Sequence, residues 1–197
     1  MTWLSASELH AMGFSSIGND VLISRQARFY NCPRIRIGDN VRIDDFCVLS
    51  AGVEGIHIGN HVHIALFCSL MGQANIWLED FSGLSSRVSI YSSNDDYSGK
   101  ALTNPTVPDA YKNVRHAPVK VGRHVIIGSG SVILPGVILA EGAAVAALSL
   151  VKADCQPFSI YAGTPARRIG ERSRGLLEYE QQLMSDIKGE RSPTDTR

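Results

Sequence analysis

The sequence predicts an all-β solenoid built from coils of short parallel strands, and three observations support this fold class. Aliphatic or aromatic residues recur at every sixth position through most of the 197-residue chain. These positions fall into six groups of three, one group for each coil. Glycine follows the first position of a group at Gly18, Gly38, Gly59 and Gly122. The recurring positions are Ile17, Ile23, Phe29, Ile37, Ile43, Leu49, Ile58, Ile64, Leu70, Leu78, Leu84, Ile90, Val121, Ile127, Ile133, Leu139, Val145 and Val151.

A period of six matches neither an α-helix, which repeats about every 3.6 residues, nor an amphipathic strand, which repeats every second residue. It matches a coil with three flat sides, each of which turns one residue inward. Stacked coils bury a continuous apolar column, and each coil provides hydrogen-bond partners for the next. The alternative is a β-sandwich with accidental spacing, and it is disfavoured because the register survives in six separate groups.

Residues 1–16 are predicted to form a helical cap at the start of the solenoid. Ser5 and Glu8 have the spacing of a capping box, and Gly13 suits the C-terminal end of a short helix. The cap is expected to cover the otherwise open first coil.

Coils are predicted over residues 17–92 and 119–152. Residues 93–118 between them interrupt the six-residue repeat and are mostly polar. A long loop that leaves a rigid scaffold is usually functional, so we interpret this segment as an active-site loop.

A C-terminal helix is predicted over residues 171–188, followed by a polar, disordered tail over residues 189–197. The whole chain is predicted to be one domain. The apolar residues of the helix recur at helical spacing, which indicates packing on the coils or on a neighbour. These residues are Leu176, Leu177, Leu183, Met184 and Ile187.

Composition excludes several classes. The formal net charge is zero, which argues against nucleic-acid binding, and no apolar run is long enough to span a membrane. The N-terminus does not resemble a signal peptide. Four cysteines without a CxxC pair are expected to be reduced thiols of a cytoplasmic protein.

The six-residue repeat, the single loop and the segment Tyr161–Ile169 (YAGTPARRI) together resemble the hexapeptide-repeat acetyltransferases. That family includes galactoside and maltose acetyltransferases and the sugar acyltransferases of surface-polysaccharide pathways. The run Ser85–Gly99 is similar to the subgroup found with O-antigen and capsule genes, which includes dTDP-4-amino-4,6-dideoxyglucose acyltransferases. The resemblance implies a left-handed parallel β-helix, a homotrimer with active sites between subunits, acetyl-CoA as co-substrate, a nucleotide-sugar acceptor and no metal.

The resemblance also implies a coenzyme A site along the C-terminal coils. Small residues there would let the pantetheine arm approach the backbone, and basic residues would meet the nucleotide phosphates. The alternatives are plain corner packing for the small residues and a solvated surface pair for the two arginines. The residues implied are Ser129, Gly130, Ala147, Lys152, Arg167 and Arg168, with Gly128 and Ala146 beside them.

The catalytic base is where the sequence departs from the galactoside-type pattern, because Asp95 occupies the place of the expected histidine. A neighbouring carboxylate, Asp96, could tune Asp95 as a base, and His116 at the end of the loop is the other candidate. An amine needs less assistance than a hydroxyl, so the departure favours N-acetylation over O-acetylation. Direct attack in a ternary complex is expected, with an oxyanion held by the N–H of Ser129 or Gly130.

Three further residues beside the loop are candidates for acceptor binding: Asn94, Tyr97 and Tyr91. His124 could support the site from a coil corner.

Two other classes are weighed against the acetyltransferase. A metal-dependent lyase or hydrolase on the same fold would use His57, His61 and His63 as zinc ligands, although all three lie within one coil. A non-catalytic binding trimer is the other alternative, and failure to bind coenzyme A would favour it. Serine acetylation and antibiotic acetylation are disfavoured.

Overall fold

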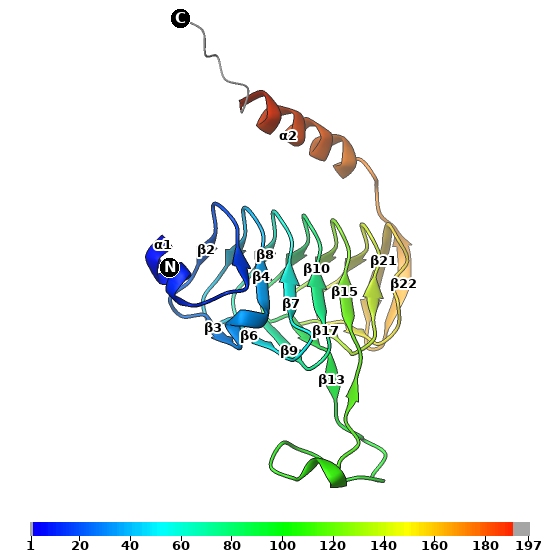
Figure 1. The fold of residues 1–197 in the computed structure, drawn as a ribbon. Helices are drawn as coiled ribbons and strands as arrows, with labels where there is room; N and C mark the ends of the chain where they lie inside the picture. The colour runs from blue at the N-terminus through cyan, green and yellow to red at the C-terminus, as the bar shows by residue number, and fades with distance from the viewer. Residues whose placement is uncertain (1, 191–197) are drawn as a thin grey trace, which may run out of the picture.

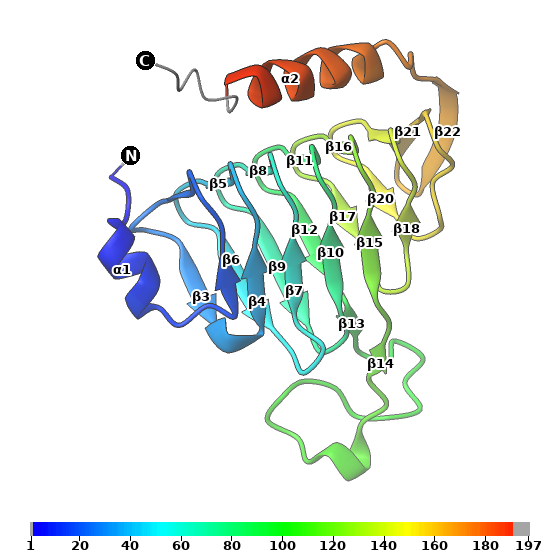
Figure 2. The same cartoon turned by 45° about the horizontal axis from the view of Figure 1, so that its top comes forward.

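The computed structural model describes residues 2–190, and it shows a three-sided parallel β-helix with two projections (Figure 1). The loop of residues 93–118 leaves one side of the coils, and the C-terminal helix lies over the opposite side (Figures 1 and 2). Most of the predicted disordered tail, residues 191–197, lies outside the described residues.

Three sheets form the sides of the coils, and each successive coil adds one strand to each sheet. The first sheet contains β1 (Ser16–Ile17), β4 (Ile35–Ile37), β7 (Ile56–Ile58), β10 (Ile76–Leu78), β15 (Val119–Val121) and β18 (Ile138–Leu139). The second contains β2 (Leu22–Ile23), β5 (Arg42–Ile43), β8 (His63–Ile64), β11 (Gly83–Leu84), β16 (Ile126–Ile127), β19 (Ala144–Val145), β21 (Ser159–Gly163) and β22 (Ala166–Glu171). The third contains β3 (Arg28–Tyr30), β6 (Val48–Ala51), β9 (Ser69–Gly72), β12 (Ser89–Tyr91), β17 (Val132–Ile133) and β20 (Leu150–Val151).

The strand register confirms that the residues of the six-residue repeat form the core. In the first sheet Ile37 pairs with Ile58 and Leu78 pairs with Val121, and the other two sheets continue in the same way. Every position of the six-residue repeat therefore lies in one of three columns. All of these side chains are buried except Ile17 and Phe29 of the first coil, which are partly buried. Burying one such side chain contributes about 1.5–3 kcal/mol, so the repeated columns dominate the stability of the coils.

The corners use a left-handed backbone conformation, which Asn40 and several bulky residues adopt. At the corner between the first and second sheets, His61, Phe81 and His124 all have φ between 55 and 59°. This conformation costs a bulky residue about 1–2 kcal/mol. The three rings stack, with centroids 4.7 Å apart for His61 and Phe81 and 5.1 Å apart for Phe81 and His124. Stacking of this kind offsets part of the cost.

The short helix α1 (Ala6–Ala11) covers the N-terminal end of the solenoid (Figure 2). Ser5 is its N-cap, and the capping box with Glu8 is formed as predicted. Met12 is the C-cap and Gly13 follows it with φ of 71°. Leu9 joins the core, and Glu8 also pairs with Arg25 of the first coil. The cap is thus tied to the first coil by apolar packing, by this ion pair and by backbone hydrogen bonds such as that from the Leu4 N–H to the Ile23 carbonyl at 2.9 Å.

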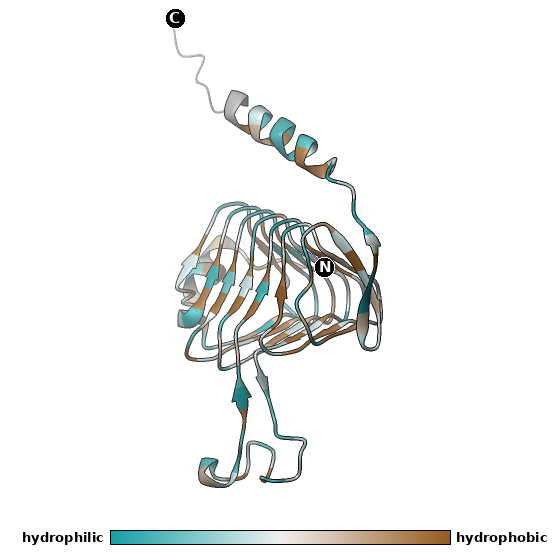
Figure 3. Ribbon diagram, turned by 90° about the vertical axis from the view of Figure 1, so that its right-hand side faces the viewer, coloured by the Kyte–Doolittle hydropathy of each residue, from teal (hydrophilic) through white to brown (hydrophobic). Residues whose placement is uncertain are grey.

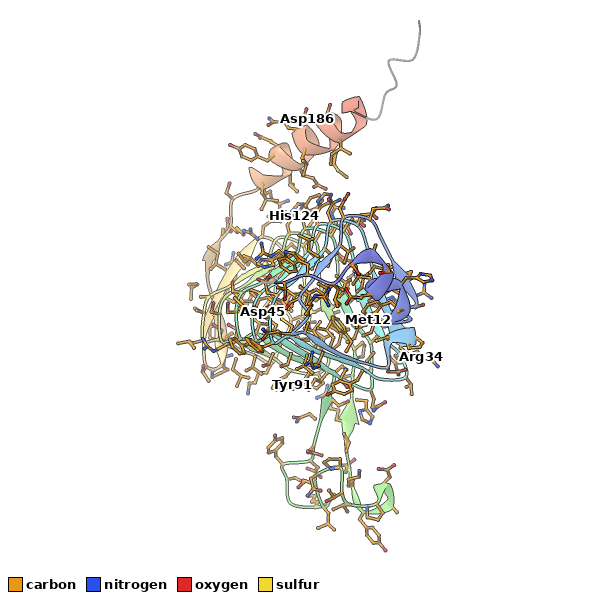
Figure 4. The ribbon with its side chains drawn as sticks, turned by 90° about the vertical axis from the view of Figure 1, so that its left-hand side faces the viewer. Met12, Arg34, Asp45, Tyr91, His124 and Asp186 are labelled. Carbon is orange, nitrogen blue, oxygen red and sulfur yellow. The ribbon has the colours of Figure 1, made fainter. Side chains whose placement is uncertain are left out.

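The C-terminal end differs in detail from the sequence prediction. Strands β21 and β22 form an antiparallel hairpin through a cis Thr164–Pro165 bond, so helix α2 (Leu176–Glu190) begins later than the expected residue 171. Helix α2 returns over the coils (Figure 1) and mixes polar and apolar residues (Figure 3). Its Glu180 accepts a hydrogen bond from His124, at 2.9 Å, and pairs with Arg123. His124 lies on the side of the coils that faces α2 (Figure 4).

Among the described residues, no helix is both long and apolar enough to cross a membrane. All four cysteines are free thiols, three buried and Cys32 partly exposed.

Candidate active site

The loop predicted as part of the site begins and ends in a two-stranded antiparallel ribbon. Strand β13 (Ser93–Asn94) pairs with β14 (Arg115–His116), in register Ser93 to His116. The loop tip contains a short 3-10 turn, η2 (Asp109–Tyr111), where Lys112 pairs with Asp109 at 2.8 Å. The ribbon therefore holds Asp95, which follows β13, near His116, although the two are far apart in sequence.

A cavity of about 440 Å³ lies where this ribbon leaves the coils, at the corner between the third and first sheets. Asn94, Asp95 and His116 all line it. The coil contributes Gly72 and Gln73, and the far side of the loop contributes Lys112. Three of the predicted site residues thus share one concave space whose volume is in the range of small-molecule sites.

His116 is oriented by a partner that sequence reasoning missed. The Ser93 hydroxyl and His116 Nδ1 are 2.7 Å apart, and the backbone N–H of Gln73 donates to the same hydroxyl at 2.8 Å. Depending on the tautomer, either the hydroxyl or the imidazole is the donor of the first bond. The only sequence signal was the position of Ser93 at the start of the loop.

Asp96, Tyr97 and Tyr91 are placed differently from Asp95. Asp96 accepts the backbone N–H of Ser98 at 2.8 Å and a weaker bond from Asn113. The hydrogen bonds from Ser98 lower the pKa of the Asp96 carboxyl. Tyr97 is 87% exposed, and neither Tyr97 nor Tyr91, which pairs with Met71 on the third sheet, lines the cavity. The Asp96 carboxylate therefore stabilises the turn of the loop and does not line the cavity.

A second hollow, of about 310 Å³, lies along the second sheet and reaches its corner with the third sheet. His63, Gly83, Ser85 and Ser129 line it. A Cβ atom on Gly83 would meet no heavy atom within 4 Å, so the missing side chain opens this hollow. This is the corner at which the resemblance places the pantetheine arm.

The small residues of that corner leave room for an extended ligand. Ser129 and Ala147 are exposed, and the Leu148 N–H donates to the Ser129 carbonyl at 2.9 Å. The N–H of Gly130 donates to the Ser86 carbonyl at 3.0 Å. Gly130 is therefore occupied, and of the two expected oxyanion donors the Ser129 amide is the one without a partner among the described residues.

The structure separates the two adjacent arginines that were predicted to act together. Arg167 and Arg168 alternate along β22, and the Arg168 Nε donates to the Ser159 hydroxyl at 3.1 Å. Arg167 is exposed, and among the described residues its side chain bonds only to the neighbouring Ala166 carbonyl, at 3.3 Å. Lys152 is exposed at the end of β20. Arg167 and Lys152 keep their charge available, whereas Arg168 is turned toward the other end of the hairpin.

The three clustered histidines have three different surroundings. His57 lies beside Trp77 with ring centroids 5.8 Å apart, His61 stacks on Phe81, and His63 Nε2 is 2.9 Å from Asp44 Oδ2. Within the part of the chain that the structure describes, no group of three His, Cys, Asp or Glu side chains is arranged to hold a metal ion.

Asp44 is a buried carboxylate that sequence reasoning missed. Its side chain is 3% exposed and is bound by Arg42 Nε at 2.7 Å as well as by His63. Burial raises the pKa of this carboxyl, but the bonds from Arg42 and His63 outweigh it, and the net pKa is lowered. Asp44 thus fixes the orientation of His63 at the rim of the second hollow.

The chain is similar over nearly its whole length to an acyltransferase. It is 53% identical over 180 residues to the dTDP-4-amino-4,6-dideoxy-D-glucose acyltransferase of Escherichia coli, which covers 91% of this chain and 94% of that one. No protein-family model matches the chain.

Solved structures agree with this relation. AntD, an N-acyltransferase from Bacillus cereus solved with dTDP and 3-hydroxybutyryl-CoA, has a TM-score of 0.91 and 44% identity, covering 94% of this chain and 98% of AntD. Other AntD structures carry replacements of an aspartate or a serine. A galactoside acetyltransferase bound to coenzyme A, at 19% identity and a TM-score of 0.56 over 86% of this chain and 74% of its own, shares the fold.

A relative of this identity and coverage settles both the fold and the family. The three-sided coils form a left-handed parallel β-helix, and the chain belongs to the hexapeptide-repeat acyltransferases, in the dTDP-4-amino-4,6-dideoxyglucose acyltransferase group.

Proposed function

We propose that the chain transfers an acetyl group from acetyl-CoA to the amino group of a nucleotide-linked amino sugar. The observation that carries this proposal is the cavity at the base of the loop, where Asn94, Asp95 and His116 converge. The relation to enzymes that carry dTDP-4-amino-4,6-dideoxyglucose and acyl-CoA in their names and complexes supports the same substrates here.

Asp95 is the group best placed to receive the amine proton. The acceptor nitrogen, once deprotonated, attacks the thioester carbonyl carbon, the C–S bond breaks, and the coenzyme leaves as a thiol after it takes up a proton. A carboxylate can hold the ammonium form and take up its proton before the neutral amine attacks. The remaining acceleration comes from holding the two substrates in line.

The role of His116 depends on its tautomer. If the Ser93 hydroxyl donates to Nδ1, the proton of the neutral ring is on Nε2, and His116 acts as a hydrogen-bond donor in the cavity. If Nδ1 donates to Ser93, Nε2 is a free base. The second arrangement favours O-acetyl transfer to a sugar hydroxyl, which is the second candidate function.

The corner at Ser129 and Ala147 fits the acyl-CoA arm. Both residues are small and exposed, and the hollow beside them is polar on one side because of Ser85 and Ser129. The unpartnered Ser129 amide would stabilise the oxyanion. Lys152 and Arg167 would meet the phosphates of the coenzyme.

The loop cavity and the Ser129 hollow lie at different corners of the same chain, so one chain does not bring them together through its own coils. A homotrimer would place the loop of one subunit against the coils of the next and complete the site. We assign the protein to this trimeric state, to the cytoplasm and to the synthesis of O-antigen or capsule precursors.

The test is a direct transfer assay with dTDP-4-amino-4,6-dideoxyglucose and acetyl-CoA, followed by thiol release and mass analysis of the product. A mass gain of one acetyl group on nitrogen is expected. Transfer to a hydroxyl of an acceptor without the amine would favour the second candidate. Failure to bind acetyl-CoA or the sugar nucleotide at millimolar concentration would overturn the proposal.

A further inference from the structure

The C-terminal end of the solenoid contains a cavity that lies outside the transfer site proposed above. It has a volume of about 460 Å³ and lies where the β21–β22 hairpin leads toward α2 (Figure 2). It opens at the corner between the first and second sheets, where Arg172 contacts the carbonyls of His124 and Gly142. The Ser129 hollow and the loop cavity are at the other two corners.

Three guanidinium groups line this cavity, and each is held by a different contact. Arg168 donates from Nε to the Ser159 hydroxyl at 3.1 Å. Arg172 donates from Nη1 to the His124 carbonyl at 2.6 Å. Arg174 places its guanidinium carbon 4.3 Å from the centre of the Phe158 ring.

Phe158 itself is fixed, which makes it a rigid platform for Arg174. Its ring fills the space beside Gly142, where a Cβ atom would come within 2.5 Å of the ring. The cations are therefore positioned before any ligand arrives, which reduces the entropy lost on binding.

The charges around the cavity are unbalanced. Glu171, the one carboxylate among the residues that line the cavity, pairs with Arg168 at 3.1 Å and has an 84% exposed side chain, so two of the three arginines there have no acidic partner in the lining. Among the side chains that the structure describes, no carboxylate pairs with Arg172 or Arg174. Burial lowers the pKa of the Arg172 guanidinium, as expected for a cation that is partly removed from water and bonds to neutral carbonyls.

We propose that this cavity binds the phosphate group of a small molecule, with Arg172 and Arg174 as its principal ligands. A guanidinium presents several N–H donors in a plane and matches phosphate oxygens in a forked geometry. The Ser159 hydroxyl and Arg168 complete the polar rim. The volume exceeds that of a bare phosphate ion and falls in the range of sites for small organic ligands.

The site also contacts the attachment of α2. Arg172 bonds to the carbonyl of His124, and the imidazole of His124 bonds to Glu180 of α2. A phosphate group at Arg172 therefore stabilises the same corner to which the helix is docked.

The test uses the full-length protein and inorganic pyrophosphate as the probe. Coenzyme A and dTDP are first added in excess, so that the phosphate sites of the transfer reaction are filled, and pyrophosphate is then titrated by calorimetry. We expect saturable binding of one per chain, and at least ten-fold weaker binding by Arg174→Gln. Arg34→Gln, which removes an exposed guanidinium from the opposite end of the coils (Figure 4), should bind as the wild type does.

Three results would overturn the assignment. They are the absence of pyrophosphate binding, unchanged binding by Arg174→Gln, and a rise in the KM for acetyl-CoA in Arg174→Gln that matches the loss of pyrophosphate binding. The last result would assign the cavity to the coenzyme. Arg172→Lys, checked by thermal melting for an intact fold, should also weaken binding because lysine cannot reproduce the fork.

Parallel titrations with inorganic phosphate and ADP, under the same excess of coenzyme A and dTDP, separate a free anion from a nucleotide as the natural ligand. The Arg174→Gln variant identifies which binding signal comes from this cavity. The titration therefore tests the phosphate site whether or not the protein transfers an acetyl group.

Discussion

Replacement of Glu180 by glutamine should release helix α2 from the coils while leaving the coils intact. The Glu180 carboxylate is 15% exposed and bridges the buried imidazole of His124 and the half-exposed guanidinium of Arg123. A hydrogen bond to a charged group contributes about 1.5–3 kcal/mol. Because Arg123 is 38% exposed and also approaches Asp80 and Glu141, we discount its share and expect a net loss of about 2 kcal/mol.

A loss of about 2 kcal/mol corresponds to about a 30-fold shift in the docking equilibrium at 25 °C. Native-state hydrogen exchange measures this shift directly, since the amides of α2 exchange through local undocking. We expect amides of α2 to exchange about 30-fold faster in Glu180→Gln and amides of the coils to be unchanged. Glu178→Gln, on the same helix but exposed, is the matched control.

The docking should also weaken in acid. Burial raises the pKa of Glu180, but the bonds from His124 and Arg123 outweigh it, and the net pKa lies below the ordinary value of 4.5. The carboxylate therefore contributes its full stabilisation above pH 4.5 and loses it as the pH falls through the lower folded-state pKa. Equal exchange rates of α2 amides in the wild type and Glu180→Gln near pH 7 would refute this account.

The remaining predictions concern the site and the core. Asp95→Asn should lower kcat for acetyl transfer by about 10²–10⁴-fold with little change in acceptor KM, and a change below three-fold in steady-state assays would exclude Asp95 as the base. Ser93→Ala should lower kcat/KM because the His116 ring loses the hydroxyl that orients it through Nδ1; an unchanged kcat/KM would mean that this bond does not position His116 for the reaction. Leu70→Ala should destabilise the coils by about 2–5 kcal/mol in urea denaturation, whereas the half-exposed Leu22→Ala should cost far less, and similar losses would contradict the assignment of the core column.

The sequence was sufficient for the coils because their physical signal is periodic. Because each side of a coil buries one residue, an apolar residue occurs at every sixth position. Ile37, Ile58 and Leu78 lie in one column for that reason. The loop was equally visible as a break in the six-residue repeat, so the convergence of Asp95 and His116 could be anticipated.

Contacts between side chains of different coils could not be predicted in the same way. Asp44 and His63 are 19 residues apart, and His124 and Glu180 are 56 apart, so each contact depends on a stacking register that no local motif records. The hairpin β21–β22 was missed for a related reason. Antiparallel pairing of residues 159–171 produces no six-residue repeat, and the alternation that separates Arg167 from Arg168 exists only within the strand.

The loop of residues 93–118 is inserted in a way that leaves the pairing of the coils unchanged. The N–H of Ala117 donates to the Ser92 carbonyl at 3.0 Å, so the two ends of the excursion are joined directly at the coil. Strand β15 pairs with β10 in the same register that β10 keeps with β7. The pairing of the coils therefore does not depend on the length or content of the loop. The proposed acceptor site could diversify by replacement of this segment while the solenoid stays unchanged.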